Sequence, residues 1–106
     1  MNGKTIPIAC DMEAFTPEQR RRHSDLSEEL RQTTEEVKEL SNGYAFRYKR
    51  DENTWMRVAE YVDLERRCCP FFSFDLKREA ESGDVWLSLT GREGVRAFLA
   101  EQIERS

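Results

Sequence analysis

Residues 72–90, FSFDLKREAESGDVWLSLT, decide the fold because they contain two runs in which apolar and polar side chains alternate. Alternation with a period of two is typical of strands that have one covered face. The turn residues Ser82 and Gly83 separate the two runs, so the stretch predicts an antiparallel hairpin with strands over 72–78 and 85–90. The apolar positions are Phe72, Phe74 and Leu76 in the first run and Val85, Leu87 and Leu89 in the second.

Two further segments upstream have the composition of strands. Residues 44–49, YAFRYK, alternate in the same way and predict a third strand of the sheet. Residues 4–9, KTIPIA, are apolar enough for a short fourth strand. Pro7 lacks an amide donor, however, and would confine that strand to an edge.

The first predicted helix begins at a capping box. Thr16 is the expected N-cap, Pro17 occupies the first helical position and Gln19 follows three residues after the cap. An apolar stripe at helical spacing continues to about Leu40. The sequence Ser41-Asn42-Gly43 is expected to end this helix there.

Two more helices are predicted further along the chain. One is capped by Asp51 or Asn53, continues toward Cys69 and ends at Pro70. The other opens at Thr90, which stands three residues before Glu93 in capping-box spacing. With the strands, these elements predict an α+β fold, a small antiparallel sheet of three or four strands with helices packed on one face. The 106 residues suit a single domain over residues 1–106.

The net charge, the apolar runs and the cysteine content each limit the expected partners and location of the protein. The net charge of -4 argues against nucleic acid, whose phosphates favour a basic surface. The first residues lack the pattern of a secretory signal, and no apolar run approaches the roughly 20 residues that cross a bilayer. We therefore expect a cytoplasmic protein without a membrane partner. Three cysteines are an odd number, which favours free or metal-bound thiols over a disulfide framework.

Two of these cysteines, Cys68 and Cys69, are adjacent at the end of the second predicted helix. Glu65 lies three and four residues before them and therefore shares their side of the helix. Thiolates favour soft cations, so the pair predicts zinc or a heavier thiophilic ion as cofactor or cargo. Cys10 could supply a third sulfur, with His23 or Glu65 as another ligand. Only tertiary structure would bring these residues together.

Each of these candidate residues also has a purely structural interpretation. Free cysteine is often buried as a small apolar side chain, so core packing explains the pair about as well as a thiol site does. Cys10 alone fits the core better, His23 lies on the apolar stripe of the first helix, and Glu65 fits a solvated or arginine-paired carboxylate.

The run ERRCCPFFSF at residues 65–74, with IAC at 8–10 and WLSLTGREG at 86–94, resembles a family of small, mostly uncharacterised bacterial proteins. They share a Glu-Arg-x-Cys-Cys-Pro-Phe motif. Similar segments lie beside or fused to regulators of the mercury-responsive type, so the resemblance implies handling of a heavy metal or metalloid. The resemblance implies that Cys10, Glu65, Cys68 and Cys69 belong to the functional site.

The leading hypothesis is a cytoplasmic thiol protein that binds a soft heavy-metal or metalloid ion through Cys68, Cys69 and Cys10. One alternative is an enzyme that performs redox chemistry or cleaves a carbon-metal bond, with a thiolate as nucleophile and Glu65 as proton carrier. Another is a non-catalytic interaction module with structural cysteines. A homodimer is a weaker expectation, because so small a sheet leaves an edge available.

Overall fold

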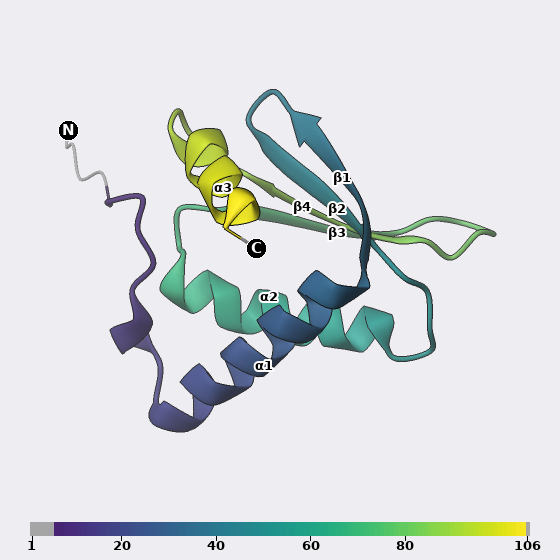
Figure 1. Cartoon of the computed structure of the whole chain (residues 1–106), viewed down its shortest axis with the longest axis horizontal. Coiled ribbons are helices and arrows are strands. Elements are labelled where there is room, and N and C mark those ends of the chain that lie inside the picture. The colour runs from purple at the N-terminus through teal and green to yellow at the C-terminus, as the bar shows by residue number, and fades with distance from the viewer. Residues whose placement is uncertain (1–5, 106) are drawn as a thin grey trace.

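The computed structural model describes residues 6–105 and has the predicted α+β fold (Figure 1). Three α-helices, one short 3-10 helix and four strands occur in this part of the chain. In order they are η1 (Met12–Ala14), α1 (Pro17–Thr33), β1 (Thr34–Leu40), β2 (Gly43–Tyr48), α2 (Thr54–Cys68), β3 (Ser73–Arg78), β4 (Val85–Thr90) and α3 (Val95–Glu104).

The four strands form one antiparallel sheet in the order β1-β2-β4-β3. The predicted hairpin is confirmed as β3 and β4, in which Phe74 lies opposite Leu89 and Leu76 opposite Leu87. The predicted third strand is confirmed as β2, which pairs with the other side of β4. Apolar side chains of these strands share one sheet face because directly opposed residues point the same way.

The prediction that the first helix reaches Leu40 is wrong. Helix α1 ends at Thr33, and residues 34–40 form the edge strand β1. The hydroxyl of Thr33 donates to the carbonyl of Glu29, and that of Thr34 donates to the carbonyl of Leu30. These two side chains therefore add hydrogen bonds to carbonyls near the end of the helix, where Thr and Ser side chains compete with its continuation.

Residues Ser41 and Asn42 make a hairpin turn instead of ending a helix. Leu40 pairs with Gly43 across this turn, so the chain reverses directly from β1 into β2. A Cβ atom at Gly43 would lie 1.9 Å from the carbonyl oxygen of Leu89 in β4. Glycine is thus required here by the close approach of a neighbouring strand.

Two predictions at the ends of the chain also need correction. Residues 4 and 5 of the predicted strand 4–9 lie outside the described residues, and residues 6–9 are not a strand. Helix α3 starts at Val95 after Gly94, whose φ of 101° favours glycine, and not at Thr90. Thr90 instead ends β4, where it pairs with Gly43.

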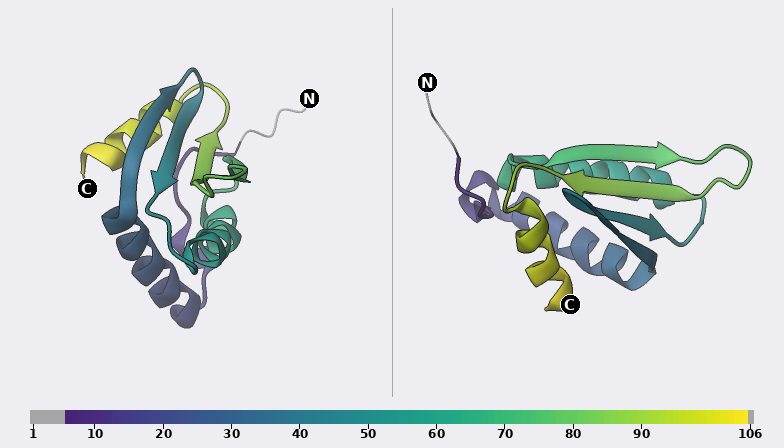
Figure 2. Two further views of the ribbon diagram at one scale, coloured as in Figure 1. Left: turned by 90° about the vertical axis from the view of Figure 1, so that its right-hand side faces the viewer. Right: turned by 90° about the horizontal axis from the view of Figure 1, so that it is seen from above.

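The helices pack on one face of the twisted sheet. Figure 1 shows α1 crossing α2 beneath the strands, and Figure 2 shows α3 lying across the end of the sheet. Side chains from all three helices and from β2 and β4 meet around one cavity on this face. The largest fully buried side chains are Leu26, Leu87, Val58, Val95, Cys68 and Cys69. Within residues 6–105, none of the helices combines the length and apolar character needed to cross a membrane.

Candidate metal centre

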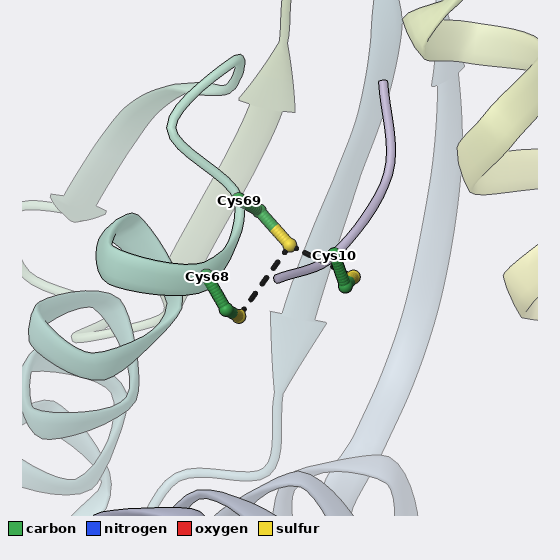
Figure 3. Close-up of side chains that lie close together, drawn as sticks. All are labelled: Cys10, Cys68 and Cys69. Atoms are coloured by element: carbon green, nitrogen blue, oxygen red, sulfur yellow. Dashed lines mark hydrogen bonds between the residues drawn. The ribbon is translucent and has the colours of Figure 1, made fainter. Parts of the chain in front are cut away.

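The sulfurs of Cys10, Cys68 and Cys69 converge beside the end of α2 (Figure 3). The Cys10 and Cys69 sulfurs are 3.0 Å apart although their residues are 59 positions apart in the sequence. The Cys68 and Cys69 sulfurs are 3.6 Å apart. All three lie within 4.8 Å of one another, so a single atom can contact them together.

The end of α2 explains how two adjacent cysteines can face the same point. Cys68 is the last helical residue, and Cys69 leaves the helix with φ of -130° and ψ of 66°. Its amide still donates to the carbonyl of Glu65 at 2.8 Å. The following Pro70 prevents the helix from continuing. This break turns the Cys69 side chain toward that of Cys68, as Figure 3 shows.

A backbone hydrogen bond holds the N-terminal segment against the helix end. The amide of Asp11 donates to the carbonyl of Cys68 at 2.8 Å. That carbonyl belongs to the last turn of α2, where carbonyls lack partners within the helix. Further along, Phe15 is buried in the core and anchors the same segment. Cys10 is therefore fixed opposite the cysteine pair by bonds that the sequence does not reveal.

The three cysteines differ in exposure. Cys68 and Cys69 are both 0% exposed, whereas Cys10 is exposed. All three are free thiols. Because Cys10 is the accessible member, an incoming ion would meet its sulfur first and reach the buried pair afterwards.

The hydrogen bonds within the cluster shift the pKa values of the three cysteines in different directions. Hydrogen bonds from Cys68 and Cys69 lower the pKa of Cys10 well below that of a free thiol, and attraction to His23 adds to this effect. Donating to Cys10 raises the pKa of Cys68 to about 12 and also raises the pKa of Cys69, with burial acting in the same direction. These shifts make Cys10 the first of the three cysteines to lose its proton.

The predicted residues His23 and Glu65 lie directly next to this cluster. His23 Nε2 and Glu65 Oε1 are 2.6 Å apart, and the same oxygen is 3.6 Å from the Cys68 sulfur. Their side chains are only 13% and 10% exposed. Together with Cys68 they form a second group whose ligand atoms lie within 4.8 Å of one another. Cys68 belongs to both groups and connects them.

Two aromatic residues that sequence reasoning missed hold His23 in place. The His23 ring stacks on Tyr61 at 5.6 Å between centroids and contacts Phe15 at 5.0 Å. Tyr61 lies four residues before Glu65 in α2, so the two share one face of that helix. This spacing was a signal available in the sequence, whereas nothing in it pointed to Phe15.

Arg66 and Arg67, which directly precede the cysteine pair, form ion pairs with another residue of α2. Both pair with Asp63, at 2.9 Å and 3.8 Å, on an exposed part of α2.

The spacing of the sulfurs suits coordination of one thiophilic atom. Two sulfurs bound tetrahedrally to one zinc ion at about 2.3 Å lie about 3.8 Å apart. The separation of 3.6 Å between Cys68 and Cys69 is close to this value, and that of 3.0 Å between Cys10 and Cys69 is shorter. A small movement of the exposed Cys10 would complete the fit. The arrangement can therefore offer three sulfurs, with a carboxylate and an imidazole adjacent.

Comparison with known proteins gives no relative from which a role could be transferred, since no family model, curated protein or solved structure matches the chain. The resemblance to segments near mercury-responsive regulators therefore stays a prediction. The geometry of the site alone carries the functional argument.

Proposed function

We propose that the protein binds one soft heavy-metal or metalloid ion through Cys10, Cys68 and Cys69. The observation that carries this proposal is the convergence of three free thiols, two of them fully buried, from segments 59 positions apart. Thiolates favour soft and borderline ions over magnesium or calcium. Hard ions would find at most one carboxylate and one imidazole beside the three sulfurs.

The protonation of the cluster supports this role. The exposed Cys10 thiolate is the nucleophile that meets an incoming ion, because thiolates and not thiols bind metal. Once the ion is bound, its charge displaces the protons of Cys68 and Cys69. Free thiols of this kind persist in a reducing compartment, so we also propose a cytoplasmic location.

Glu65 and His23 have a supporting role in this proposal. The Glu65 carboxylate, held by His23 at 2.6 Å, adds negative charge beside Cys68. Supporting groups of this type orient ligands and strengthen a metal site. With a larger coordination number, Glu65 or His23 also becomes a direct ligand, since both have an atom within reach of Cys68.

Titration of the reduced protein with Hg(II), arsenite, Cd(II) and Mg(II) tests the proposal. One equivalent of each thiophilic species should protect three thiols from a thiol-specific reagent, and Mg(II) should protect none. Cys10→Ser should lower Cd(II) affinity at least ~10-fold. The matched control is Met56→Leu, which removes a soft sulfur that is 68% exposed on the same helix that ends in the pair. Thiols that stay reactive in the presence of excess Hg(II) and arsenite would refute the proposal.

A further inference from the structure

A cavity of about 280 Å³ lies beside the sulfur cluster, and a bare ion bound to the sulfurs would leave it unfilled. Cys10, His23 and Glu65 are part of its wall. Most of the remaining wall is hydrocarbon from the helices and the covered face of the sheet. Its apolar side chains include Leu30, Phe46, Phe72, Phe98, Leu99 and Ile103.

The cavity is large enough for an organic group. An apolar cavity of about 150 Å³ in another protein is known to hold benzene. The cavity here exceeds that volume, and three phenylalanine rings contribute to its wall. Arg31 and Gln102 also line it and are exposed, so they mark its open side.

The position of the sulfurs relative to the cavity fits a ligand with two parts, a thiophilic atom and an apolar substituent. Cys10 lines the cavity, and the Cys69 sulfur lies 3.0 Å from the Cys10 sulfur. An atom bound to both sulfurs would therefore stand at the cavity wall. A substituent on that atom can then extend into the apolar cavity.

We propose that the natural ligand is a monosubstituted organometalloid or organometal, such as trivalent arsenic carrying one aryl group. The thiols bind the thiophilic element and the cavity holds its hydrocarbon substituent. This inference rests on the function proposed above and names its ligand class. Trivalent arsenic with one carbon substituent binds two sulfurs. Its hydrocarbon substituent then needs an apolar space next to the thiols, which the cavity provides.

The binding step is a ligand exchange without a change of oxidation state. In an arsonous acid R–As(OH)2, Cys10 and Cys69 each replace one hydroxyl group. Two As–O bonds break and two As–S bonds form, and the arsenic stays trivalent. Each hydroxyl leaves as water, with its proton taken from the Cys69 thiol or, for the Cys10 thiolate, from solvent. The As–C bond is unchanged.

The experiment compares methyl and phenyl arsenic(III) compounds on the full chain, because both form the same two As–S bonds and differ only in the substituent. Affinities are measured in competition with a free dithiol, which corrects for intrinsic differences between the compounds. Burying the larger apolar group should favour phenyl over methyl by roughly 10 to 100-fold. Phenyl arsenic(III) should protect two thiols, whereas arsenite should protect three.

Ile103→Trp tests whether the cavity causes this preference. Ile103 is half-buried near the end of α3, where a larger side chain would fill the cavity. The variant should lose the phenyl preference and keep arsenite affinity. Glu101→Trp, on an exposed position of the same helix, should change neither. Phe98→Trp provides a second cavity-filling variant should Ile103→Trp fail to fold.

The outcomes separate the two proposals. Arsenite binding by three thiols without a phenyl preference, or a preference that survives both cavity-filling variants, would overturn the inference and leave the ion-binding function standing. Failure of Hg(II), arsenite and phenyl arsenic(III) alike to protect any thiol would overturn both. A phenyl preference that Ile103→Trp or Phe98→Trp abolishes and Glu101→Trp retains would support the inference.

Discussion

The amide of Asp11 donates a hydrogen bond of 2.8 Å to the carbonyl of Cys68, the residue that ends α2. This bond joins the N-terminal segment to the cysteine pair through the backbone alone. Cys10 immediately precedes Asp11, so the bond holds the Cys10 backbone beside the cysteine pair. The candidate site therefore depends on an anchor that is not itself one of its ligands.

Asp11→Pro should disconnect Cys10 from the pair, because proline has no amide hydrogen to donate. We expect Cd(II) affinity to fall roughly 10 to 100-fold, to the level of Cys10→Ser, while the core remains folded because Asp11 is exposed. Isothermal titration and a thermal melt measure the two effects. Asp11→Ala is the control, since it keeps the amide and loses only the carboxylate that caps η1. Equal affinities in both variants would show that the anchor is dispensable.

Glu65→Gln should weaken Cd(II) binding by roughly 10 to 100-fold, because it removes negative charge beside the bound cation. The same change should speed alkylation of the metal-free thiols. The reason is that the Glu65 charge raises the pKa values of Cys68 and Cys69. Glu60→Gln, an exposed carboxylate of α2 paired with Arg22, serves as the matched control. Faster alkylation with unaltered Cd(II) affinity would limit Glu65 to tuning free thiols.

Cd(II) binding should release two protons at neutral pH. The lowered pKa of Cys10 leaves it deprotonated, while the pKa of Cys68, raised to about 12, and the raised pKa of Cys69 keep both protonated until the cation displaces their protons. Affinity should accordingly rise about 100-fold per pH unit between roughly pH 6 and 8. Calorimetry in buffers of different ionisation enthalpy counts the protons. A count of three would mean that Cys10 is protonated as well, contrary to the proposed state of the cluster.

Mild oxidation of the metal-free protein should link Cys10 to Cys69 before any other pair. Their sulfurs are 3.0 Å apart, and the Cys10 thiolate is the natural attacking group in thiol oxidation. Peptide mapping by mass spectrometry identifies the bond, and prior binding of arsenite should prevent it. A dominant intermolecular disulfide through Cys10 would instead indicate that the N-terminal segment leaves the site in solution.

The fold could be predicted where apolar and polar residues alternate clearly, and the prediction was wrong where helix propensity conflicts with strand pairing. The alternation in β3 and β4 appears within each strand, and their turn lies between them. Residues 34–40 contain three glutamates, one lysine and one leucine, which favour helix. Pairing with β2 overrides that preference, and Ser41 and Asn42 form the hairpin turn at the place where the sequence predicts a helix end.

The candidate site combines contacts within one helix with contacts between distant segments. Helical spacing placed Glu65 beside Cys68 correctly because both residues belong to α2. The pairing of His23 with Glu65 joins residues 42 positions apart, and no local pattern encodes it. The cavity could not be predicted either, because its wall combines side chains from three helices, three strands and the connecting segments.

X-ray absorption spectroscopy of the protein loaded with one equivalent of arsenite tests the central claim most directly, because it identifies the atoms bound to arsenic. The account predicts three sulfur neighbours and no oxygen in the native chain. In Cys10→Ser it predicts two sulfurs and one oxygen. A native spectrum with two sulfurs and one oxygen, unchanged by Cys10→Ser, would contradict the three-thiol site.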